Sequence, residues 1–315
     1  MSDEFDLLGL SKTELYQQHL EMFGWPEWPP TEVPPYTEWW KQEKYLRVLP
    51  NRALNPITKS HTAEITGAPQ TGKTTMEKAL VEELKRKLKG TSWNLHVWEE
   101  GHVGGNERVF FEARQPLPYP YGSPEEDEVY TAMWDKEEDP WLTSLHMQLS
   151  KGVWWKLWIE SYVEKTDSQK PNLVIGYRGP LDSNIWLYAT AAHRTDPKMV
   201  VPDWYRKTVL PIWLPYIIDF ELMTRHVDSI VITGVSQETA QERRRIAGKR
   251  YNSWITDSPI YKDYLAWLGY WIENVYPILH FQKGTGLLVV DGEDSLEANT
   301  QKLIDYVVEA TGLRQ

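Results

Sequence analysis

The sequence contains no cysteine, and it has no long hydrophobic run. Without cysteine the chain cannot form disulfides, zinc–thiolate sites, iron–sulfur clusters or a thiol nucleophile. The most apolar long stretch, residues 209–218, is interrupted by Pro211 and Pro215 and is far shorter than the ~20 residues that a membrane span needs. The first residues are acidic and lack the basic start of a secretory signal. We therefore expect a cytoplasmic protein that does not associate with membranes.

Basic residues are also in short supply, since 34 Lys and Arg stand against 45 Asp and Glu, a formal net charge of -11. A protein that coats nucleic acid needs a basic surface, so we expect no nucleic-acid partner. Phenylalanine is scarce, with 6 residues, whereas Trp and Tyr number 17 each. Such amphipathic aromatics line a core or groove, stack on a base, or form a surface for self-association. A homo-oligomer formed through an aromatic surface therefore stays open.

Residues 1–58 differ in composition from the rest of the chain. Between residues 24 and 40, proline recurs among the tryptophans Trp25, Trp28, Trp39 and Trp40. Proline at this density excludes a helix or a central strand. We expect an extended N-terminal arm whose Trp side chains pack on the main body, with docking to a partner as the alternative.

From residue 59 to residue 315 the pattern is that of one α/β domain. Apolar strands are predicted at 63–66, 94–98, 172–177, 229–233 and 287–290. Helical periodicity separates them, at 75–88, 141–162, 181–193, 202–225, 238–250, 259–281 and 295–310. The alternation predicts a five-stranded parallel sheet with helices on both faces. An irregular insertion at about 102–140 carries acidic runs that we expect to be solvated.

One motif carries the chemistry. Residues 67–74, Gly-Ala-Pro-Gln-Thr-Gly-Lys-Thr, match G-x-x-x-x-G-K-[ST] and lie between a predicted strand and a predicted helix. The glycines let backbone N–H groups turn inward around phosphate oxygens, and the helix N-terminus adds its positive dipole end. Lys73 reaches the β- and γ-phosphates and the Thr74 hydroxyl binds magnesium in this motif. The predicted ligand is ATP with Mg²⁺, and its binding residues are Gly67, Gln70, Thr71, Gly72, Lys73, Thr74 and Thr75.

Charged residues follow two further predicted strands. Glu99 and Glu100 come after the second strand, and Arg178 comes after the third. Ligands bind at the carboxyl ends of parallel strands, where a guanidinium can stabilise a transferring phosphoryl group. The alternatives are a solvated strand end for the two glutamates and a structural ion pair between Arg178 and Asp182.

A basic segment follows the fourth strand. Residues 243–250 hold five basic residues in eight, among them Arg243, Arg244 and Arg250, in an acidic protein. The segment at about 237–250 is predicted to be a lid that brings cations over a triphosphate, the alternative being a solvated helix face. Asp291 ends the last predicted strand, and we expect it near the base rather than on magnesium.

Together these segments resemble the P-loop nucleoside and nucleotide kinases: thymidylate kinase, the deoxynucleoside kinases and the ribosylnicotinamide kinase type. The resemblance runs from about residue 60 to the end and rests on the P-loop, on Arg178-Gly179-x-Leu181-Asp182 and on the start of the lid helix. It implies that Glu99 or Glu100 is the base or a substrate ligand, that Arg178 contacts phosphate, and that Arg243, Arg244 and Arg250 supply lid contacts. Tyr177 stands where the family has an acid beside this Arg, so Asp182 or Glu99 would take over the role of that acid, and Asp182 is the candidate for an outer contact to magnesium.

The sequence therefore predicts a kinase, or failing that an ATPase. The reaction would be phosphoryl transfer from ATP–Mg²⁺ to a small acceptor that is nucleoside-like or a nucleotide. Two other classes stay open: a regulator in which the P-loop drives a conformational switch, and a partner-binding protein that binds nucleotide without turnover.

Overall fold

The computed structural model describes residues 34–42, 47–54, 59–98, 170–177, 227–248 and 253–313, together with positions 155, 158, 159, 163, 179, 181 and 182. The acidic insertion, the helix predicted at 202–225 and most of those predicted at 141–162 and 181–193 lie outside these residues. Within the described ranges, no helix combines the length and apolar character that a membrane crossing needs.

A six-stranded sheet forms the centre, with strand order β1-β6-β5-β2-β4-β3. Its strands are β1 Arg47–Val48, β2 Ser60–Gly67, β3 Asn94–Trp98, β4 Asn172–Tyr177, β5 Ser229–Gly234 and β6 Gly286–Asp291. The five predicted strands are confirmed and all pair in parallel. The predicted number of strands was one too low, because the arm adds β1 antiparallel to β6. Two residues are too few to show a strand periodicity, so only pairing with the β6 edge reveals this strand.

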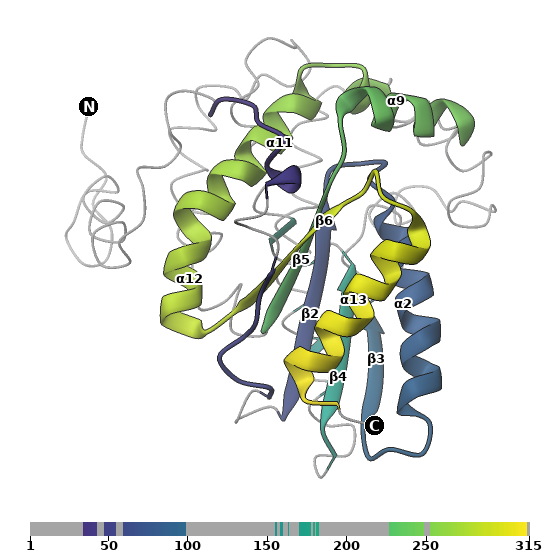
Figure 1. Ribbon diagram of the computed structural model, residues 1–315, viewed down its shortest axis with the longest axis vertical. Coiled ribbons are helices and arrows are strands. Elements are labelled where there is room, and N and C mark those ends of the chain that lie inside the picture. The colour runs from purple at the N-terminus through teal and green to yellow at the C-terminus, as the bar shows by residue number, and fades with distance from the viewer. Residues whose placement is uncertain are drawn as a thin grey trace, which may run out of the picture.

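Helices cover both faces of the sheet, as predicted (Figure 1). Helices α2 (Lys73–Leu88) and α13 (Leu296–Thr311) share one hydrophobic cluster with Ile65, Ile175 and Val231. Helices α11 (Ile260–Tyr270) and α12 (Tyr276–Lys283) share the other cluster with Ile230 and Ile232. Alternate residues of one strand thus enter opposite cores, which is why these strands are continuously apolar.

The C-terminal half contains three departures from the predicted helices. A π-helical segment, Trp271–Val275, joins α11 to α12 within the helix predicted at 259–281, just before Pro277, which cannot donate to a helical ladder. Helix α9 (Gln237–Ile246) ends before residue 250, and Gly248 follows it with a φ of 66°. A short helix, α10 (Ser253–Thr256), was not predicted.

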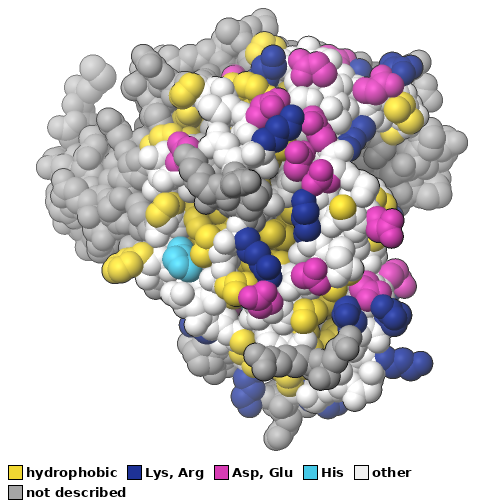
Figure 2. All heavy atoms as spheres, in the orientation of Figure 1, with side chains coloured by type: hydrophobic (Ala, Val, Ile, Leu, Met, Phe, Trp, Pro, Cys, Tyr) yellow, Lys and Arg dark blue, Asp and Glu magenta, His cyan; other side chains and the backbone are white. Residues whose placement is uncertain are grey.

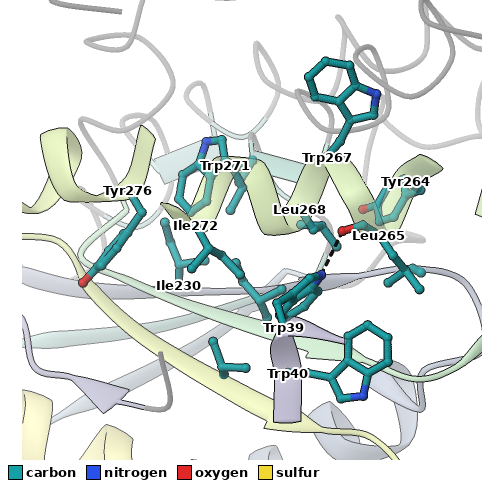
Figure 3. Packing of buried hydrophobic residues seen from close by; sticks show 14 of the residues in the cluster. Trp39, Trp40, Ile230, Tyr264, Leu265, Trp267, Leu268, Trp271, Ile272 and Tyr276 are labelled. Carbon is teal, nitrogen blue, oxygen red and sulfur yellow. Dashed lines mark hydrogen bonds between the residues drawn. The ribbon is translucent and has the colours of Figure 1, made fainter. Parts of the chain in front are cut away.

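The N-terminal arm packs on the body where the structure describes it. The 3₁₀ turn η1 (Trp39–Lys41) buries Trp39 and Trp40 to 1% and 0% exposure. Trp39 Nε1 donates to the Leu265 carbonyl at 2.8 Å, and Figure 3 shows Trp39 between α11 and the sheet. The predicted packing is confirmed for these two residues, whereas Trp25 and Trp28 lie outside the described residues.

Charges of both signs cover the surface. On the face drawn in Figure 2, Lys and Arg side chains of the described residues are interspersed with Asp and Glu side chains. Some exposed charges pair with a residue three positions away in the same helix, such as Lys85 with Glu82 on α2 and Arg245 with Glu242 on α9. Pairs this exposed add little to stability.

Candidate functional site

The motif at residues 67–74 forms a P-loop between β2 and α2. Three of its residues have a positive φ: Gly67 at 139°, Gln70 at 63° and Gly72 at 91°. Gly72 is also the N-cap of α2, so the loop leads directly into the helix N-terminus. A Cβ at Gly67 would collide with the carbonyl of Thr233, so this position requires glycine for space as well as for φ. The backbone thus has the turned conformation that gathers N–H groups around an anion.

Lys73 lies inside this loop. Its Nζ donates to the carbonyls of Gly67 and Ala68 at 2.6 Å each, and the side chain is 3% exposed. The Nζ also lies 5.9 Å from the ring centroid of Tyr177. The ammonium group is therefore held where the phosphate oxygens of a P-loop ligand would enter.

The threonines of the P-loop and of the first turn of α2 divide into two kinds. Thr74 and Thr75 are exposed in the first turn of α2, so the Thr74 hydroxyl is accessible to a metal ion. Thr71 is buried, and its Oγ1 bonds to the Ala68 carbonyl at 3.0 Å and to Thr233 Oγ1 at 2.7 Å. The side chain of Thr71 thus stabilises the loop through its hydrogen bonds.

Asp182 lies beside the start of the P-loop. Its Oδ1 accepts from Thr66 Oγ1 at 2.8 Å, and Thr66 directly precedes the loop. The hydroxyl of Tyr264 on α11 donates to the same oxygen at 3.3 Å. The other oxygen, Oδ2, is buried and has no hydrogen-bond partner among the described residues. A buried oxygen without a partner is costly, so this position suits a water, a metal-bound water or a substrate hydroxyl.

Glu64 is a buried acid that the sequence analysis did not single out. It lies on β2 with 0% exposure, and its two carboxyl oxygens accept from the backbone N–H of Asp182 at 2.9 Å and of Leu181 at 3.1 Å. A Cβ at Gly179 would lie 2.9 Å from Glu64 Cδ, so this glycine lets the turn approach the acid. Glu64 therefore fixes the segment that carries Asp182. The available signal was a carboxylic acid between the apolar residues Ala63 and Ile65 in the middle of a strand.

We expect Glu64 to make the protein less stable as the pH rises. Burial raises its pKa from 4.5 to about 8, against the effect of the Asp182 and Leu181 N–H groups. The folded state then holds a proton that the unfolded state has lost, so the free energy of unfolding falls between pH 4.5 and 8. The fall should be on the order of a few kcal/mol in total.

Urea unfolding of the wild type and Glu64→Gln between pH 6.5 and 8.5 measures this effect. Asp228, with a pKa raised to about 6 by burial, has largely titrated below this window, and the effect of His61, whose pKa burial lowers to about 4 in the folded state, is the same in both proteins. As the pH rises, the free energy of unfolding should fall more for the wild type than for Glu64→Gln. Parallel curves would contradict the assignment.

Among the predicted lid residues that the structure describes, Arg243 reaches the P-loop. Its Nη2 donates to the Gly292 carbonyl at 2.6 Å and its Nη1 donates to the Gln70 carbonyl at 3.4 Å. Arg244 instead pairs with Asp257 at 2.7 Å. In Figure 1, α9 lies above the sheet, near the point where α2 begins.

Four predicted site residues lie outside the described part of the chain: Arg178, Glu99, Glu100 and Arg250. The roles predicted for Glu99, Glu100 and Arg178 at the acceptor and phosphate, and for Arg250 in the lid, stay predictions. The strands that precede three of them are neighbours, with Trp98 of β3 opposite Gly176 of β4. Asp291 ends β6, which β5 separates from the P-loop strand β2.

Comparison with known proteins gives a limited structural similarity. No protein-family model matches the sequence, and no curated protein matches it. Among solved structures, the chain is similar to deoxyadenosine kinase from M. mycoides with bound dATP, at 16% identity and a TM-score of 0.41, covering 78% of this chain and 97% of that one. The same enzyme with bound dCTP gives 15% identity and a TM-score of 0.46, covering 79% and 99%. The function proposed below therefore rests on the residues of this chain.

Proposed function

We propose that this protein is a P-loop phosphotransferase that moves the γ-phosphoryl group of ATP to a small nucleoside-like or nucleotide acceptor. The observation that carries the proposal is the complete P-loop between β2 and α2, with its positive φ angles and with Lys73 inside it. Catalysis in this class is mostly positioning and charge stabilisation, which these groups can supply.

The described residues fit ATP with Mg²⁺. Backbone N–H groups of the P-loop and the N-terminus of α2 would hold the phosphates, and Lys73 would exchange its carbonyl partners for phosphate oxygens. Bound Mg²⁺ would offset the charge of the β- and γ-phosphates, and Thr74 and Asp182 are the residues that would hold it. Asp182 fits this role because its Oδ2 is buried without a partner among the described residues.

The transfer itself needs an acceptor hydroxyl or phosphate oxygen in line with the γ-phosphorus. A bond forms from this oxygen to the phosphorus while the bond to the β,γ-bridging oxygen breaks, and ADP leaves with the electron pair. A hydroxyl acceptor gives its proton to a carboxylate, for which Glu99 or Glu100 is proposed. Arg178 is proposed to stabilise the phosphoryl group in transit, and Arg243 to close the loop over the nucleotide.

Release of ADP in the presence of candidate acceptors tests the proposal. Nucleosides and nucleoside monophosphates are added singly to the protein with ATP and Mg²⁺, and ADP is measured by a coupled assay. At least one acceptor should raise ADP release to about 1 s⁻¹ or more, the range of kinases. Hydrolysis that no acceptor stimulates, or ATP binding without turnover, would contradict the proposal and favour a regulator or a partner-binding protein.

The variant Asp182→Asn refines this test. Asparagine keeps the oxygen that accepts from Thr66 and Tyr264 and replaces the oxygen that has no partner among the described residues. Acceptor-stimulated ADP release should fall about 10- to 100-fold, the usual effect of losing an outer contact to a metal site. Asp305→Asn on α13 is the control, because this carboxyl bonds only Gln301 in the described interactions.

A further inference from the structure

The arm places one ammonium group beside the loop that follows β6. Lys41 Nζ lies 3.1 Å from Glu293 Oε2 and 3.1 Å from Glu38 Oε2. The position of Lys41 is set by the two residues before it, because Trp39 is bonded to α11 and Trp40 packs on Gly234 at the end of β5. A Cβ at Gly234 would lie 2.5 Å from the Trp40 ring, so the contact is close.

Glu293 connects this ammonium group to the start of α9. Its Oε1 accepts from the backbone N–H of Ser236 at 3.1 Å and from Thr239 Oγ1 at 3.0 Å. Ser236 is the N-cap of α9, so both bonds act on the first turn of that helix. Burial alone would raise the pKa of Glu293, but the hydrogen bonds from Ser236, Lys41 and Thr239 outweigh it and lower the pKa to about 2.

The loop that follows β6 also contacts the P-loop. Gly292 donates to the Gly234 carbonyl at 2.9 Å and accepts from Arg243 Nη2 at 2.6 Å. A Cβ at Gly292 would lie 2.8 Å from the carbonyl oxygen of Thr71, so loop and P-loop are packed against each other. Contacts therefore run without interruption from Lys41 through Glu293 and α9 to Arg243 and the P-loop.

We propose that Lys41 is a positioning residue for the nucleotide site, which acts through Glu293 to fix the first turn of α9 and with it Arg243 over the P-loop. The inference rests on the proposed function, because it assumes that ATP binds at this P-loop. It assigns a role in ATP binding to the arm, a segment outside the resemblance to kinases.

If Lys41 had only a structural role, its replacement would change the stability of the protein and not its affinity for ATP. Lys41 and Glu293 are 43% and 28% exposed, and an ion pair with this exposure contributes little to the stability of the whole protein. The arm offers a matched control in Arg47, also 43% exposed, which pairs with Glu309 on α13. No interaction described for that pair involves α9 or the P-loop.

The experiment compares the full chain with Lys41→Ala, Lys41→Arg, Glu293→Gln, the double variant of Lys41→Ala with Glu293→Gln, and Arg47→Ala. Calorimetry measures the Kd of a non-hydrolysable ATP analogue with Mg²⁺, hydrogen exchange follows the amides of residues 236–243, and urea unfolding measures stability. Lys41→Ala should weaken binding about two- to fivefold and accelerate exchange in α9. Lys41→Arg should bind the analogue as tightly as the wild type does. Because Lys41 and Glu293 act through the same contact, the double variant should lose no more affinity than the single variant that binds more weakly.

The controls separate two failures. If the wild type does not bind the analogue, the proposed function is overturned and this inference falls with it. If the wild type binds and Lys41→Ala binds equally well, only the inference is overturned. Equal weakening by Lys41→Ala and Arg47→Ala also overturns it, because the effect would then belong to the arm in general.

Discussion

Lys73→Ala is expected to weaken the binding of ATP–Mg²⁺ about a hundredfold or more and to lower turnover about a hundredfold in addition. Lys73 Nζ donates to two carbonyls of the P-loop, at 2.6 Å each, and would donate to phosphate oxygens in their place. Hydrogen bonds from a charged donor contribute about 1.5–3 kcal/mol each, so losing two of them costs about 3 kcal/mol or more, which corresponds to at least a hundredfold loss of affinity. The loss of charge stabilisation should lower turnover by a further factor of about 100.

Calorimetry with the non-hydrolysable analogue measures the affinity, and circular dichroism checks that the variant is folded. Alanine is well tolerated in the first turn of α2, so the fold should persist. Lys78→Ala is the control, because Lys78 is an exposed lysine of the same helix. Unchanged affinity in a folded Lys73→Ala protein would remove the basis of the proposed function.

Trp40→Ala is expected to destabilise the protein by about 3–5 kcal/mol, the usual cost of truncating a buried tryptophan. Trp40 is 0% exposed, packs on Gly234, and meets the Trp39 ring edge-on with centroids 5.2 Å apart. Figure 3 shows both rings within the cluster beneath α11. The free energy of unfolding in urea measures the effect.

Tyr36→Ala provides the matched control on the same arm. Tyr36 is 37% exposed and contacts Trp40 from the side, with centroids 6.4 Å apart, so its loss should cost about 1 kcal/mol or less. If Trp40→Ala does not accumulate, Trp40→Phe should still cost about 1–2 kcal/mol. A Trp40→Ala protein as stable as the wild type would show that the arm is an appendage and not part of the core.

The sequence alone determined the α/β architecture and the P-loop. Both depend on local patterns: apolar strands separated by helical periodicity, and a run of eight residues whose glycines fix the backbone. Local patterns also located Lys73, Thr74 and the start of α9. These features need no knowledge of which strands are neighbours.

Only the tertiary structure decided which groups meet at the site. Glu64 and Leu181 are 117 positions apart, and Lys41 and Glu293 are farther apart still, yet each pair is in contact. Their contacts follow from the strand order, which places β2 between β4 and β5, and from the arm, which runs along β6. A sequence pattern records the neighbours of a residue along the chain. Contacts between distant residues are set by how strands and helices pack together, and that packing maximises the burial of apolar surface over the whole molecule.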